Sequence, residues 1–175
     1  RVNVTVDLIP ERRAATIESA WVETTQAEAG QTIPLKFFLR PYRGPRIERQ
    51  IELALPAGLS KGEYRILLSD ADTLNRIQSA AGRANRFIDL DRSISLISQE
   101  LTNNKVYVSL LSAGSTLYYD DKILPSLPPS VLNVMQAGPS ASRSMIAARE
   151  TIVSQIAVPF DYMVSGSYSL TITIK

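Results

Sequence analysis

The sequence predicts a mainly β domain of the α+β class, an antiparallel β-sandwich with two inserted helices at about 72–103. Apolar residues recur at every second position in several segments separated by turn-forming residues, which is the pattern of half-buried strands. Between two such segments, over 71–104, the apolar spacing changes to the three or four residues of a helix. Most strands are joined by short connections, which favour antiparallel pairing.

The clearest element is a hairpin made of residues 33–39 and 47–55. Its turn contains Pro41, Gly44 and Pro45, which suit a turn and oppose the continuation of either strand. A turn centred on Gly44 places apolar residues opposite one another on one face and opposite charges on the other. The pairs that this register predicts are Leu35 with Leu53, Phe37 with Ile51, Lys36 with Glu52, and Arg40 with Glu48.

The remaining strands follow from the same alternation. They are expected at 2–8, 15–22, 64–70, 105–111, 115–123 with a turn at Asp120 and Asp121, 146–160, and 170–174. The strand at 146–160 is long and should be bent. Trp21 is the only tryptophan, and we expect it in the core or at the edge of the core, because a buried indole contributes a large packing area.

The helical insertion is expected to contain two helices. Asp72 is placed to cap the first helix, which Gly82 ends. Asp89 or Asp91 is placed to cap the second, which reaches Leu101. A further short helix is expected near 129–135, because proline suits the first turn of a helix.

Composition sets limits on function. The 175-residue chain fits one domain, 1–175, and it has no cysteine, no histidine and a net charge of +2. These absences exclude disulfides, thiolate nucleophiles, and catalytic triads or metal sites that need imidazole. Basic residues are not gathered in a run, and no apolar run approaches membrane-spanning length, so we expect no nucleic acid, no membrane insertion and no cofactor.

Three acidic pairs are candidates for calcium binding or acid–base catalysis, because carboxylates serve both. The pairs are Asp70 with Asp72, Asp89 with Asp91, and Asp120 with Asp121. The first two pairs lie at predicted helix starts, where capping and the helix dipole also explain them, and the third lies in a turn. The sequence favours these structural roles, so we predict no catalytic or metal-binding residue.

Two surface features are candidates for binding. Arginines and a tyrosine gather at the hairpin tip, where they suit an acidic or aromatic partner unless the tip is simply solvated. These residues are Arg40, Tyr42, Arg43 and Arg46, with Arg49 nearby. The proline-rich stretch around Leu127 and Pro128 is the second candidate, either as a docking segment or as a stiff connection.

Four spaced motifs carry a resemblance to a known family. They are Ile17-Glu-Ser-Ala20, Phe38-Leu-Arg-Pro-Tyr-Arg-Gly44, Leu124-Pro-Ser-Leu-Pro-Pro-Ser-Val-Leu132, and Val164-Ser-Gly-Ser-Tyr-Ser-Leu-Thr-Ile172. Together they resemble the β-rich C-terminal region of exported bacterial proteins that carry an upstream domain similar to the sporulation factor IVB serine peptidases. The resemblance implies a periplasmic or cell-envelope location and an accessory domain without the peptidase residues.

The sequence therefore leads to three functional hypotheses. The first is a non-catalytic structural or interaction domain, expected to be a fragment of a longer exported protein and to contact other domains of that polypeptide or a protein partner. The second is a carbohydrate- or peptide-binding module, which should expose aromatic side chains on one face. The third is an enzyme that uses carboxylates alone, which needs two acids about 5 to 10 Å apart in a cleft.

Overall fold

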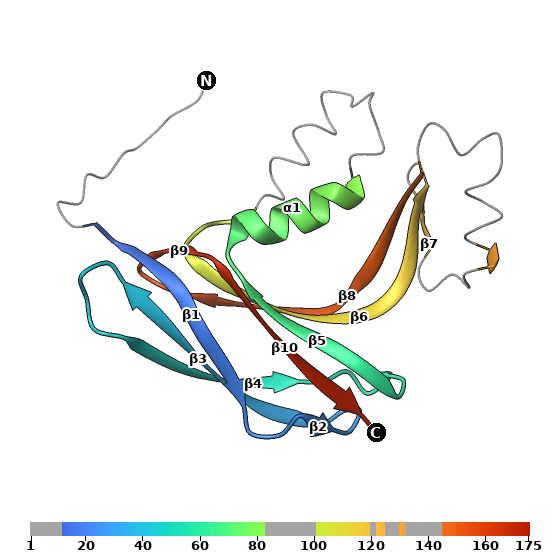
Figure 1. Cartoon of the computed structure of the whole chain (residues 1–175), viewed down its shortest axis with the longest axis horizontal. Coiled ribbons are helices and arrows are strands. Elements are labelled where there is room, and N and C mark those ends of the chain that lie inside the picture. The colour runs from blue at the N-terminus through green and yellow to red at the C-terminus, as the bar shows by residue number, and fades with distance from the viewer. Residues whose placement is uncertain (1–11, 83–100, 120–121, 125–129, 132–144) are drawn as a thin grey trace.

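The computed structural model describes residues 12–82, 101–119, 122–124, 130–131 and 145–175. In these residues, two β-sheets pack face to face, and one helix covers the outer surface of the larger sheet (Figure 1). The predicted fold class is thereby confirmed. The predicted strand at 2–8 lies outside the described residues.

The strands of the described chain divide between a four-stranded sheet A and a six-stranded sheet B. Sheet A has the order β4 (Ile47–Ala54), β3 (Thr32–Pro41), β1 (Ala14–Val22), β9 (Met163–Ser165). Sheet B has the order β2 (Gln26–Ala27), β10 (Ser167–Ile174), β5 (Gly62–Ser69), β6 (Lys105–Tyr119), β7 (Lys122–Leu124), with β8 (Met145–Pro159) on the other side of β6. Figure 1 shows β6 and β8 continuing beyond the sandwich as a curved arm.

Strands β2 and β9 were not predicted. They contain two and three residues, which is too short for an alternating pattern to be visible. Both pair in parallel, β9 with the start of β1 and β2 with the end of β10. The expectation of antiparallel pairing holds for the other strand pairs in the described chain.

The predicted hairpin β3–β4 is present, but the predicted register is wrong by two residues. Leu35 lies opposite Ile51, and Phe37 lies opposite Arg49. A shift of two residues leaves every side chain on its predicted face, so the apolar pattern is satisfied by either register. The predicted charge pairs are not formed: Glu52 lies opposite Pro34, and Glu48 opposite Phe38.

The prediction that Trp21 is buried is also wrong. Strand β1 contains a bulge between Ile17 and Ser19, where two residues of β1 face one position of β3. The bulge changes which side chains point inward, so Ala20 and Val22 are buried after it. Trp21 consequently lies on the outer face of sheet A with 52% of its surface exposed.

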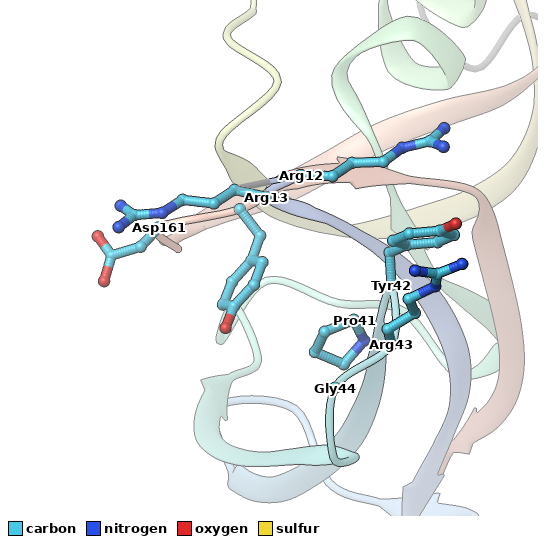
Figure 2. Close-up of a pocket in the computed structure, with 8 residues that line it drawn as sticks. Arg12, Arg13, Pro41, Tyr42, Arg43, Gly44 and Asp161 are labelled. Atoms are coloured by element: carbon cyan, nitrogen blue, oxygen red, sulfur yellow. The ribbon is translucent and has the colours of Figure 1, made fainter. Parts of the chain in front are cut away.

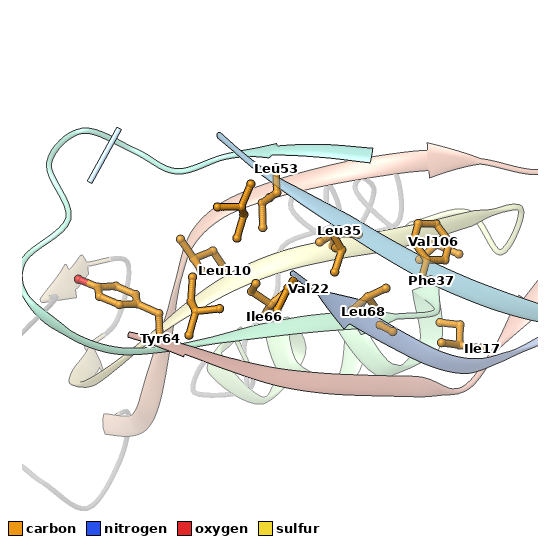
Figure 3. Packing of buried hydrophobic residues seen from close by; sticks show 14 of the residues in the cluster. Ile17, Val22, Leu35, Phe37, Leu53, Tyr64, Ile66, Leu68, Val106 and Leu110 are labelled. Carbon is orange, nitrogen blue, oxygen red and sulfur yellow. The ribbon is translucent and has the colours of Figure 1, made fainter. Parts of the chain in front are cut away.

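The core lies between the two sheets. Phe37 of sheet A packs edge to face against Phe160, with ring centroids 6.1 Å apart. Alternate residues of both sheets fill the rest of this space, as the period of two requires. Figure 3 labels Ile17, Val22, Leu35, Phe37 and Leu53 from sheet A, and Tyr64, Ile66, Leu68, Val106 and Leu110 from sheet B.

Helix α1 (Ala71–Gly82) covers the outer face of sheet B. Its Ala71 and Leu74 pack on Tyr107 of β6. The cap of α1 is Asp70 and not the predicted Asp72: an Asp70 carboxylate oxygen accepts the Thr73 N–H at 2.7 Å. The other carboxylate oxygen accepts the Gly166 N–H at 2.7 Å, so Asp70 joins the start of α1 to the turn between β9 and β10.

The rest of the predicted helical insertion lies mostly outside the described residues, including Asp89 and Asp91. Leu101, the predicted end of the second helix, is not helical; its N–H donates to the Asn75 side chain at 3.3 Å. Of the predicted helix near 129–135, residues 130–131 are described and are helical.

Candidate binding site

The candidate site is a pocket where the hairpin tip meets the start of β1. The Tyr42 N–H donates to the Ala14 carbonyl at 2.8 Å, which holds the tip against β1. The tip turns at Arg43, which has a φ of 58°, and closes with the Gly44 N–H donating to the Pro41 carbonyl at 3.3 Å. A short backbone-bonded turn therefore presents Tyr42 and Arg43 at a fixed place.

The other wall of the pocket comes from the segment between β8 and β9. The Met163 N–H donates to the Arg13 carbonyl at 2.8 Å, and β9 then pairs in parallel with β1. This pairing places Asp161 and Tyr162 beside Arg13. The resulting pocket has a volume of about 610 Å³, and its lining includes Arg12, Arg13, Tyr42, Arg43, Asp161 and Tyr162.

Tyr42 lies between two arginines on one side of this pocket. The Arg12 guanidinium carbon lies 4.7 Å from the centroid of the Tyr42 ring, and that of Arg43 lies 5.2 Å from it. Figure 2 shows the ring between these two side chains, while Arg13 and Asp161 extend on the opposite side of the pocket. Cation–π contacts of this kind orient the guanidinium groups. Tyr42 remains 49% exposed, so the arrangement is open to a ligand.

The charge of the pocket is unbalanced. Among the described residues, three arginines, Arg12, Arg13 and Arg43, line it together with one acid, Asp161. None of these three arginines forms one of the ion pairs found within the described residues. We call Arg12, Arg13 and Arg43 the pocket arginines. Their N–H groups suit a carboxylate or another oxyanion, which arginine binds through two parallel hydrogen bonds.

Two other arginines of the predicted site lie elsewhere. The Arg40 and Arg46 side chains lie on the outer face of sheet A, where both contact the Glu18 carboxylate, at 3.2 and 3.1 Å. Arg46 also stacks on the Phe38 ring at 3.8 Å and donates to the Ser19 hydroxyl at 3.0 Å. We call Arg40 and Arg46 the paired arginines, because Glu18 already supplies their carboxylate.

The remaining predicted residues do not join the pocket. The guanidinium carbon of Arg49 lies 5.7 Å from the centroid of the Phe160 ring, and Arg49 lines a different hollow. Leu127 and Pro128 lie outside the described residues. The structure therefore brings Tyr42 and Arg43 together, separates Arg40 and Arg46 from them, and leaves the proline-rich candidate untested.

Sequence reasoning missed four residues of the pocket: Arg12, Arg13, Asp161 and Tyr162. The sequence shows Arg12 and Arg13 side by side before the first described strand, but no pattern in it predicts that they lie beside the hairpin tip. That placement depends on the parallel contact between β1 and the three-residue strand β9. A pairing of only three residues between segments near the two ends of the chain leaves no periodic signal in the sequence.

The chemistry of this pocket is that of anion recognition. Its described lining residues include one carboxylate, whereas the carboxylate-only enzyme requires two in one cleft. Within the described residues, no group of three or more acids is close enough to hold a metal ion. Among the same residues, no helix is long and apolar enough to cross a membrane.

Comparison of the chain with protein-family models, with curated proteins and with solved structures gives no match.

Proposed function

We propose that this chain is a non-catalytic interaction domain that binds an acidic segment of a protein partner in the pocket. The observation that carries this proposal is the exposed Tyr42 ring between the guanidinium groups of Arg12 and Arg43. Arg13 adds a third positive charge to the same pocket, and Asp161 supplies the one carboxylate among its described lining residues. A carboxylate that enters the pocket meets several donors at once.

The arrangement favours binding for two physical reasons. The backbone bond between Tyr42 and Ala14 fixes the tip, so less conformational freedom is lost when a ligand binds. Stacking on Tyr42 orients two guanidinium groups, which leaves their N–H edges available for bidentate hydrogen bonds. Because the pocket is open to solvent, its affinity should fall as the salt concentration rises.

The proposed context is an exported bacterial protein. The resemblance of the four sequence motifs supports a position downstream of a peptidase-like domain, in the periplasm or the cell envelope. Another domain of the same polypeptide, or a separate protein of that compartment, would then supply the acidic segment. The absence of histidine and cysteine from the whole chain supports a role without nucleophilic catalysis.

Calorimetric titration with a short glutamate-rich peptide tests the proposal. We expect binding that weakens with salt and that Arg43→Ala reduces about tenfold, since one charge-assisted hydrogen bond contributes about 1.5 kcal/mol. Arg40→Ala is the matched control, because Arg40 belongs to the same hairpin but already contacts Glu18. No binding at low salt, or equal losses in the two variants, would refute the proposal.

One observation favours a carbohydrate-binding function as the second candidate. Trp21 is 52% exposed on the outer face of sheet A, beside Lys36 at 5.8 Å and near the half-buried Phe38. Exposed indole faces offer a large rigid surface for stacking. Binding of a glycan that Trp21→Ala abolishes and Arg43→Ala leaves intact would favour this candidate over the first.

A further inference from the structure

A second hollow lies next to the pocket. Asp161 and Tyr162 line both the pocket and this hollow, which has a volume of about 300 Å³. Its lining also includes Ile47 and Arg49, at the beginning of β4, and Phe160 after the end of β8. The two hollows therefore share Asp161 and Tyr162, and the second one reaches the first residues of β4.

Strand β4 is an edge strand of sheet A. It pairs with β3 on one side, and no strand of the described chain pairs with its other side. Its eight residues contain no proline, so the backbone N–H and C=O groups of the outer edge are able to pair with another chain. Such an edge recognises a partner mainly through backbone hydrogen bonds.

The sandwich also exposes apolar surface beside this edge. Ile47 and Ile51 of β4 are only partly buried and pack against the core. Ile156 and Val158 of β8, which pairs only with β6 in the described chain, are partly buried in the same way. The ends of β4 and β8 meet here, since Arg49 stands over Phe160 at 5.7 Å. An added strand with apolar residues at alternate positions would cover these side chains.

We infer that the acidic partner segment binds as an extra strand on β4, antiparallel to it, with acidic residues at its C-terminal end in the pocket. This inference rests on the proposed function. The pocket lies at the N-terminal end of β4, which is where an antiparallel strand places its C-terminal end. Antiparallel pairs outnumber parallel pairs two- to three-fold, which favours this direction.

Charge on β4 disfavours pairing between two copies of this chain in the register centred on Gln50. The outer face of β4 carries Glu48, Gln50 and Glu52. Antiparallel pairing of two copies about Gln50 would place Glu48 of each copy opposite Glu52 of the other, and like charges in that position repel. The segment recognised by β4 therefore has apolar residues facing the core, uncharged or basic residues facing outward, and acids only at its end.

A synthetic peptide tests the inference on the full chain. In the probe, valine alternates with threonine over six residues, and two glutamates follow at the C-terminus. The control peptide has the same side chains, with alternate backbone nitrogens methylated along the strand so that they cannot donate. We expect methylation to weaken binding about tenfold or more, and Arg43→Ala to weaken it about tenfold, whereas Arg40→Ala leaves it unchanged.

Hydrogen exchange provides a second measurement. Alternate amides of β4 should exchange rapidly in the free protein and slow down when the unmethylated probe binds. Amides that are already protected along both edges of β4 in the free protein would overturn the inference, because the edge would then be occupied by another part of the chain.

The outcomes separate this inference from the proposed function. If both peptides bind equally and Arg43→Ala still weakens binding, the pocket binds acids but the strand pairing is wrong. If methylation of the peptide weakens binding but Arg43→Ala does not, the placement of the acidic end in the pocket is wrong. If neither the probe nor the glutamate-rich peptide binds, the proposed function and this inference both fail.

Discussion

The two groups of arginines around the β3–β4 hairpin have the same side chain and different surroundings. Arg40 and Arg46, the paired arginines, share the Glu18 carboxylate on the outer face of sheet A. Arg12 and Arg43, both pocket arginines, flank Tyr42 and form no ion pair within the described residues. Arg40, Arg43 and Arg46 are close in sequence, but they are not equivalent as binding groups. An arginine is available to an outside carboxylate only where the fold has not already paired it with an acid.

The difference arises from one strand. Glu18 precedes Ser19 at the bulge of β1, and the strand carries both residues across the face on which Arg40 and Arg46 lie. Arg12 and Arg13 precede the first residue of β1, so Tyr42 and Arg43 at the hairpin tip meet positive charge instead of a carboxylate. The pairing partner of the hairpin, and not the hairpin itself, determines which arginines remain available.

The largest expected effect is on binding of the glutamate-rich peptide. Arg12→Ala with Arg43→Ala should weaken it about 100-fold, because two charge-assisted hydrogen bonds of about 1.5 kcal/mol each are lost. Arg40→Ala with Arg46→Ala is the matched double variant and should change the affinity less than about threefold. Calorimetry measures both. Similar losses in the two variants would break the distinction between the two groups.

The second prediction concerns Asp70, the acid that caps α1. Asp70 is 7% exposed and binds the N–H groups of Thr73 and Gly166, so Asp70→Ala should lower the free energy of unfolding by about 2 kcal/mol. Asp72→Ala, which changes an exposed acid in the first turn of α1, should cost a few tenths of that amount. Urea denaturation compares them; equal losses would contradict the assigned cap.

The third prediction concerns Asp161, the acid among the described residues that line the pocket. Asp161→Asn removes the negative charge that opposes the pocket arginines, so affinity for the glutamate-rich peptide should rise about threefold at low salt. The increase should vanish at high salt, where charges at the surface are screened. Glu23→Gln, an exposed acid beyond the other end of β1, is the control. An unchanged affinity for Asp161→Asn would place the peptide elsewhere.

The smallest expected effect is on stability. Glu18→Gln leaves both paired arginines without their carboxylate, but all three side chains are substantially exposed, so the free energy of unfolding should fall by only about 0.5 kcal/mol. The change should be largest at low salt in urea denaturation. In the same variant, Arg40 and Arg46 should form a second, weaker site for the glutamate-rich peptide. If the peptide still binds at a single site, the ion pairs with Glu18 are not what keeps Arg40 and Arg46 from binding it.

The sequence predicted those features of the fold that alternation alone determines. The hairpin and its faces are visible because Leu35 and Phe37 share a face in either register. The strands predicted at 105–111 and 115–123 are instead one strand up to Tyr119, β6. The register itself was wrong because attractive charge pairs, such as Lys36 with Glu52, were given weight, whereas exposed charge pairs contribute little to stability. The observed turn instead places Arg43 in the left-handed region and pairs Leu39 with Ile47.

Two features of the candidate site could not be predicted from local pattern. The bulge at Ser19 reverses the faces of Ala20 and Trp21, and neither residue is unusual for a strand. The pocket depends on contacts between Arg13 and Met163, which are far apart in the chain. Tyr42 and Arg43 are the predicted site residues that line the pocket. They belong to the turn that Pro41 and Gly44 predicted.

One hydrogen bond, from the Gly166 N–H to the Asp70 carboxylate, joins the start of α1 to the turn between β9 and β10. Gly166 follows β9 directly, and β9 holds the loop of Asp161 and Tyr162 against β1. Asp70 therefore links the start of α1, on the outside of sheet B, to the segment of sheet A that follows one wall of the pocket.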